Sequence, residues 1–156
     1  MSVVLKIKGN QLSVAGVKYT LPNEFYIDVN GFPLESENGL CFVTPDKACT
    51  IQIHTAETNS SSVEEDIKEL LSEGPYTIYE EPSWCSLNGL KAIKAIKAVY
   101  ASSKNEYFEM QFEPVGKNKE HVEVLLTTYK NTIGIKEVLD MPDIQQFLSN
   151  FFVDEN

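Results

Sequence analysis

Asn88-Gly89 is the strongest local structural signal in the chain, because both residue types tolerate the positive φ that a type I′ hairpin turn requires. A strand pattern at 76–81 leads toward Trp84 and into this turn. After it, residues 91–99 repeat Lys-Ala-Ile with a period of three, which fits neither a helix nor a strand cleanly. Their position directly after the turn favours a strand, so we expect an antiparallel hairpin.

The hairpin is expected to continue into a further strand through a three-residue loop at 103–105. This loop length predicts a register that places apolar residues of one face opposite each other. The expected pairs are Tyr100 with Phe108, Ala98 with Met110, and Ile96 with Phe112.

The same register brings charged residues of neighbouring strands together. Lys97 is expected opposite Gln111 and diagonal to Glu109 and Glu113. The face opposite the paired apolar residues is apolar too, and a sheet that is apolar on both faces is usually covered on both. The residues that indicate this are Trp84, Ile93 and Val99.

Before this hairpin we expect several short strands and one helix. A serine and a glutamate three residues later favour a helix start near 63, as Ser61 with Glu64 or as Ser62 with Glu65. Apolar spacing extends this helix to 71, and Gly74-Pro75 ends it. The expected strands are 3–7, 12–14, 17–19, 40–44 and 49–55, with turns at 9–10 and 45–47, a strand or extended loop at 25–29, and a loop at 30–38.

After the hairpin we expect a polar loop at 114–121, a strand at 122–127 and a helical C-terminus. A helical pattern begins at Ile135, and Pro142 fits the first turn of a new helix. The apolar stripe of that last helix is expected to dock on the sheet. It comprises Ile144, Phe147, Leu148, Phe151 and Phe152.

The chain of 156 residues is 42% hydrophobic, which predicts one domain spanning 1–156. Its net charge is −10, and all 13 basic residues are lysines. This charge argues against binding to nucleic acid or to anionic membranes, and it favours a basic partner. Three cysteines, with no signal-peptide pattern at the start, predict reduced thiols in a cytoplasmic protein.

Few residues have the spacing of a catalytic or metal site. His54 and His121 are far apart in the sequence. His54 is interpreted as an ordinary surface or helix-covered strand residue, and His121 as a residue at the junction of loop and strand, although its acidic neighbours could orient it. Cys85 has no nearby base to activate it. The acidic runs 64–66 and 80–81 lack the loop spacing of a calcium site. We therefore expect no catalytic residue, no metal and no cofactor.

Three markers together indicate a known fold. They are an opening strand that ends in Leu-Pro and an aromatic residue, the Asn88-Gly89-Leu90 hairpin, and the amphipathic tail. With the element order, this pattern resembles the PsbP-like fold, an α+β fold in which an antiparallel sheet has helices packed on both faces. The residues of the opening marker are Val17, Tyr19, Leu21, Pro22 and Phe25.

The resemblance implies a family of mostly non-enzymatic binding proteins. The family includes the photosystem II protein PsbP, a yeast Ran-binding import factor, DcrB-type bacterial lipoproteins and chaperones of type VI secretion effectors. We therefore expect a bacterial, cytoplasmic, non-enzymatic adaptor or chaperone-like module, monomeric or homodimeric, whose partner, if it has one, is a basic protein. The alternatives are a secretion chaperone specifically, and a small-molecule binder or enzyme with a pocket beneath the C-terminal helix.

Overall fold

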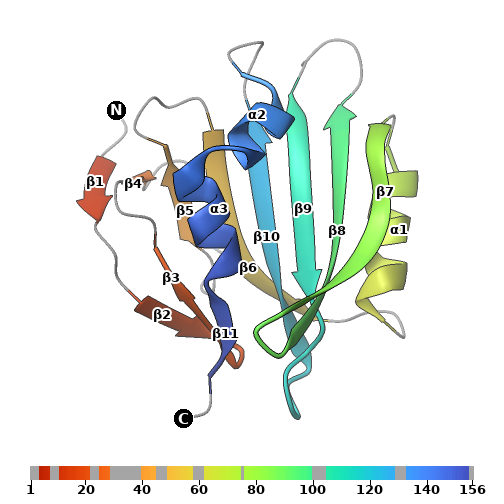
Figure 1. The fold of residues 1–156 in the computed structure, drawn as a ribbon. Helices are drawn as coiled ribbons and strands as arrows, with labels where there is room; N and C mark the ends of the chain where they lie inside the picture. Colours follow the sequence, from red (N-terminus) through yellow and green to blue (C-terminus); the bar gives the residue numbers. More distant parts are fainter. Residues whose placement is uncertain are drawn as a thin grey trace.

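The computed structural model describes residues 4–7, 11–21, 25–28, 40–44, 49–57, 62–74, 76–99, 105–128 and 133–154. Its main feature is an eight-stranded sheet in which every neighbouring pair is antiparallel (Figure 1). Across the sheet the strands are β1 (Val4–Ile7), β4 (Phe25–Asp28), β5 (Leu40–Val43), β6 (Cys49–Glu57), β10 (Glu120–Thr128), β9 (Glu106–Phe112), β8 (Leu90–Val99) and β7 (Tyr76–Leu87).

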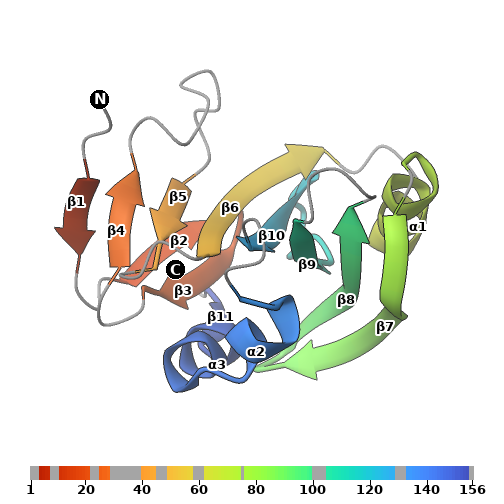
Figure 2. The ribbon, with the colours of Figure 1, turned by 90° about the horizontal axis from the view of Figure 1, so that it is seen from above.

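Helices cover both faces of this sheet, as the α+β expectation requires. Figure 2 shows α1 (Val63–Ser72) on one side, and α2 (Ile135–Leu139) with α3 (Pro142–Ser149) on the other. A three-stranded sheet adds to the second side, which the sequence did not indicate. Its strands are β11 (Phe151–Val153), β3 (Val17–Thr20) and β2 (Gln11–Val14).

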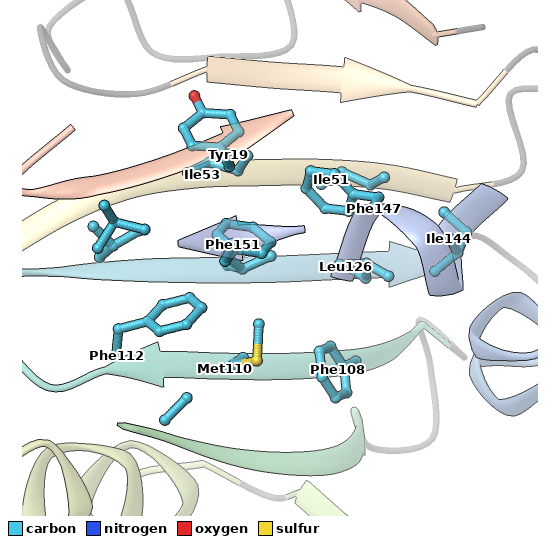
Figure 3. Close-up of a cluster of buried hydrophobic side chains, with 14 of the residues drawn as sticks. Tyr19, Ile51, Ile53, Phe108, Met110, Phe112, Leu126, Ile144, Phe147 and Phe151 are labelled. Atoms are coloured by element: carbon cyan, nitrogen blue, oxygen red, sulfur yellow. The ribbon is translucent and has the colours of Figure 1, made fainter. Parts of the chain in front are cut away.

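The main hydrophobic core lies between the large sheet and the segments on the α2–α3 side, a surface that we call the core face. Figure 3 shows aromatic and aliphatic side chains from β3, β6, β9, β10, α3 and β11 meeting there. Phe151 is central, with ring centroids 5.6 Å from Tyr19, 5.1 Å from Phe112 and 5.3 Å from Phe147. The C-terminal segment therefore holds the small sheet against the large one.

The β7–β8 hairpin forms as predicted, and residues 91–99 are strand. Asn88 and Gly89 have φ of 51° and 85°, in the left-handed region. The Asn88 side chain also donates to the carbonyl oxygens of Ser149 and Phe151, at 2.9 and 3.0 Å. The turn thus satisfies carbonyls at the end of α3 and anchors the C-terminus.

The predicted register between β8 and β9 is wrong. Ile96 pairs with Phe108 rather than with Phe112, and Lys97 lies opposite Tyr107 rather than Gln111. The last described pair is Ala98 with Glu106, so the register is shifted by four residues from the one predicted. Because the slip is even, each side chain stays on its predicted face, and Lys97 remains diagonal to Glu109.

The predicted apolar stripe of the last helix is also wrong beyond residue 149. The helix ends at Ser149, and Phe151 and Phe152 belong to a strand in which the first is buried and the second exposed. Pairing of Phe151 with Tyr19 in β3 decides this, since alternate residues of a strand point to opposite faces. Phe147 does dock on the sheet, as expected.

The remaining boundaries are close to those predicted. Residues 25–28 are strand rather than extended loop, and β10 begins at Glu120, so His121 lies within the strand and not in a loop. Ser62 caps α1, since its hydroxyl accepts from the Glu65 amide. Outside the described residues lie the turns at 9–10 and 45–47, the loop at 30–38, Pro22, Ser61, Pro75, Tyr100 and the loop residues 103–104.

Candidate functional site

Helix α1 covers only part of the sheet face on which it lies, which we call the α1 face. Val63, Ile67 and Leu71 pack on Ile93 and Ala95 of β8. Beyond this contact a cleft of about 550 Å³ opens between the helix and strands β6, β10, β9 and β8, and Tyr76 of β7 also lines it. We call it the polar cleft; the sheet contributes His54, Lys97, Glu109, Gln111, His121 and Glu123, and α1 contributes Asp66, Glu69 and Glu73.

The cross-strand register brings the two histidines to one carboxylate. Glu123 lies directly opposite His54 of β6 on one side and Gln111 of β9 on the other. Its Oε2 is 2.6 Å from Nε2 of His54, and its Oε1 is 2.9 Å from Nε2 of His121. The histidines that the sequence separates therefore share a single partner in the fold.

The shared carboxylate has an altered acidity. Burial alone would raise the pKa of Glu123, but the hydrogen bonds from His121 and His54 together outweigh it and lower the pKa to about 2. The hydrogen bond to Glu123 raises the pKa of His54 above its usual value, against the opposing effect of burial. The arrangement therefore favours an ionised glutamate next to a protonated His54.

A buried ion pair lies beside this group. Lys97 Nζ is 3.1 Å from Glu109 Oε2, and both side chains are almost fully buried. The Lys97 ammonium also lies over the rings of Tyr76 and Tyr107, at 4.6 and 5.7 Å from their centroids. Burial raises the pKa of Glu109, while Lys97 opposes that effect.

Gln111 connects the two groups and leaves one polar atom unsatisfied. Its Nε2 donates to Glu109 Oε1 over 3.4 Å, whereas its buried Oε1 has no hydrogen-bond partner among the described residues. Buried polar side chains are normally paired, so this oxygen is an exception that calls for a physical explanation. Gln111 is 2% exposed and lines the polar cleft.

This cluster was not predicted, because His54 and His121 are far apart in the sequence. Which strand neighbours β10 depends on the topology, and the pairing of β6 with β10 joins elements separated by a helix and three strands. A weak signal existed, because polar residues alternate with apolar ones in each strand. Those pairs are Gln52 and His54, Glu109 and Gln111, and His121 and Glu123.

A second cavity, of about 470 Å³, lies beneath α3, where the sequence placed an alternative pocket. We call it the α3 cavity. Phe108, Met110 and Leu148 line its apolar part, and Glu80 and Glu81 of β7 also contribute. Cys85 faces this cavity, and within the described residues no histidine lines it.

The other candidate groups have structural partners. Glu64 pairs with Lys68 at 2.9 Å and accepts from the indole of Trp84 at 3.2 Å. Cys41 and Cys49 are buried thiols that form no disulfide within the described residues. In the part of the chain that the structure describes, no three His, Cys, Asp or Glu side chains are arranged to hold a metal ion. Among the described helices, none is long and apolar enough to cross a membrane.

Comparison with known proteins identifies the fold. No protein-family model matches the chain, and no curated protein matches it in sequence. A solved structure of a mutant of the protein Mog1 is similar, with a TM-score of 0.60 and 11% identity, covering 96% of this chain and 98% of that one. The solution structure of cyanobacterial PsbP from Synechocystis sp. PCC 6803 has a TM-score of 0.57 and 11% identity, with 94% of each chain covered. The chain therefore has the PsbP-like fold.

Proposed function

We propose that this protein is a cytoplasmic, non-enzymatic binding module that holds a basic, extended segment of another protein along β7. The observation that carries the proposal is the position of this twelve-residue strand at the edge of the large sheet. An edge strand presents backbone groups with which an incoming strand can pair. The fold similarity to Mog1 and PsbP is compatible with such a role.

The side chains of β7 suit a partner that is both apolar and basic. Ile78, Tyr79 and Trp84 are 36%, 44% and 38% exposed, an unusual density of large apolar groups on one strand. Glu80 and Glu81 lie between them and are exposed as well. Trp84 already attracts an ammonium, since Lys91 Nζ lies 5.1 Å from its ring centroid.

The test is capture of partners from the native cytosol at low and moderate salt, with a charge reversal on the proposed surface. Glu80→Lys with Glu81→Lys is expected to abolish capture of the proteins that the unaltered chain retains. The matched control, Glu137→Lys with Asp143→Lys, changes the net charge equally on exposed residues of α2 and α3. Equal capture by both double variants would contradict the proposal.

A second candidate function, binding of a small apolar molecule, is favoured by the α3 cavity. Its volume of about 470 Å³ is within the usual range of ligand pockets, roughly 300–1,000 Å³. Leu148→Trp should fill the cavity and reduce the fluorescence gain of the neutral dye Nile red, whereas Phe152→Trp on the exposed side of β11 should not. Equal dye binding by both variants would count against a ligand role for this cavity.

A further inference from the structure

We infer that the polar cleft is a binding site for a small aliphatic diamine or polyamine, with one ammonium held at Gln111 and another near α1. This site lies on the α1 face and is separate from the α3 cavity. Five adjacent strands and α1 assemble it, and β7 contributes only Tyr76, not the exposed residues of the proposed partner surface. The site therefore does not depend on the proposed protein partner.

The first argument is the acceptor that the fold leaves unsatisfied. Gln111 cannot turn its amide without losing the hydrogen bond from Nε2 to Glu109, and the described residues supply no donor for Oε1. A ligand that donates a hydrogen bond at this position would satisfy it. An ammonium group has three donors and no acceptor, so it can bind this oxygen and a neighbouring carboxylate together.

The second argument is the sign of the charge around the cleft. Six carboxylates line it, against one lysine and two histidines. Glu123 is engaged by both histidines, and Lys97 neutralises Glu109. The excess is therefore negative and favours a cation. It comes from the exposed carboxylates of Glu57, Glu69 and Glu73.

The third argument is that the site already stabilises an ammonium group. Lys97 is held between a carboxylate and the rings of Tyr76 and Tyr107, which is the environment that favours a partly dehydrated amine. The sheet wall supplies Gln111, and the α1 wall supplies Glu69 and Glu73, so an amine at each end is matched.

The test is calorimetric titration of the full chain with putrescine and spermidine in an amine-free buffer, with butanediol and succinate as uncharged and anionic probes. We expect saturable binding of the two amines only. Gln111→Met keeps the side-chain length but removes the acceptor, and it should weaken amine binding by about tenfold. No amine binding by the unaltered chain, or undiminished binding by Gln111→Met, would overturn the inference.

A second variant keeps the test decisive if Gln111→Met does not fold. Glu69→Gln with Glu73→Gln alters exposed helix residues, and it should weaken putrescine binding more than butylamine binding. The matched control Glu80→Gln with Glu81→Gln makes the same charge change on β7 and should leave amine binding unchanged. Equal affinities in both double variants would also overturn the inference. Because this titration contains no protein partner, its outcome is independent of the β7 proposal.

Discussion

The two faces of the large sheet are built from the same strands and differ in how their side chains are satisfied. In β9, Phe108, Met110 and Phe112 enter the apolar core, while Glu109 and Gln111 point to the α1 face. The core face is covered by α2, α3 and the small sheet, whereas α1 leaves the polar cleft open. One strand can therefore supply rigid packing and a polar site at once.

The comparison separates two sources of stability. On the core face, each buried apolar group adds to the free energy of unfolding in proportion to the area it removes from water. On the α1 face, the buried Lys97–Glu109 pair gains attraction but loses hydration, so its net effect on stability is small. A polar cluster with little net stabilising effect is better explained by a function than by folding.

The largest expected effect is on the core face. Phe147→Ala should lower the free energy of unfolding by about 3–5 kcal/mol, because Phe147 is 1% exposed and packs edge-on against Phe151. Phe152→Ala is the control, since that ring is 38% exposed. Denaturant midpoints and solution masses should be measured for both. A normal midpoint with a lost dimer would mean that Phe147 serves association instead.

The next largest effect is expected on the α1 face. Lys97→Met should destabilise the chain by about 3 kcal/mol, because it leaves Glu109 buried without its cation. The double variant Lys97→Met with Glu109→Leu should recover most of that loss, since no unpaired charge remains. Urea denaturation of the single and double variants measures this. A double variant no more stable than Lys97→Met would show that the pair itself stabilises the fold.

A smaller effect is expected at the β7–β8 turn, which anchors the core face through Asn88. Gly89→Val should cost about 1–3 kcal/mol, because a β-branched residue is strained at a φ of 85°. Crowding adds little, since a Cβ at this position meets only Val153 Cγ2, at 3.7 Å. Gly89→Asn is the control, as asparagine tolerates this conformation. Thermal melts compare the two, and equal melting temperatures would contradict the strain argument.

The smallest effect is the pH dependence of stability that results from His54 and Glu123 on the α1 face. The raised pKa of His54 adds stability that is fully present below its ordinary value of 6.5 and is lost as the pH rises through the raised value. The lowered pKa of Glu123 adds stability above 4.5 that is lost as the pH falls through about 2. Both contributions are therefore present between about pH 4.5 and 6.5.

Thermal melts should be measured from pH 4.5 to above 6.5. The loss of stability of His54→Gln relative to the unaltered chain should be largest at pH 4.5–6.5, and it should shrink at higher pH. The same substitution in a Glu123→Gln background should show little pH dependence, because the partner carboxylate is gone. A deficit that stays constant with pH would show that the His54–Glu123 pair does not titrate as described.

Local patterns predicted much of the fold. The Asn88-Gly89 turn, the Ser62 cap and the alternation of Ile51 and Ile53 with Gln52 and His54 each depend on a few neighbouring residues. The register of β8 with β9 was predicted wrongly, and Phe151 was predicted to lie in a helix rather than in a strand. Both depend on contacts with distant segments, which outweigh the local apolar spacing.

By itself, the sequence determined most element types, the two-sided covering of the sheet and the acidic charge, because periodicity and composition act through near neighbours and bulk solvent. Only the tertiary structure decided that His54 and His121 meet at Glu123 and that Gln111 lies beside them with an unsatisfied oxygen. The physical reason is that cross-strand neighbours are set by the order in which strands pair, and that order results from the packing of the whole sheet.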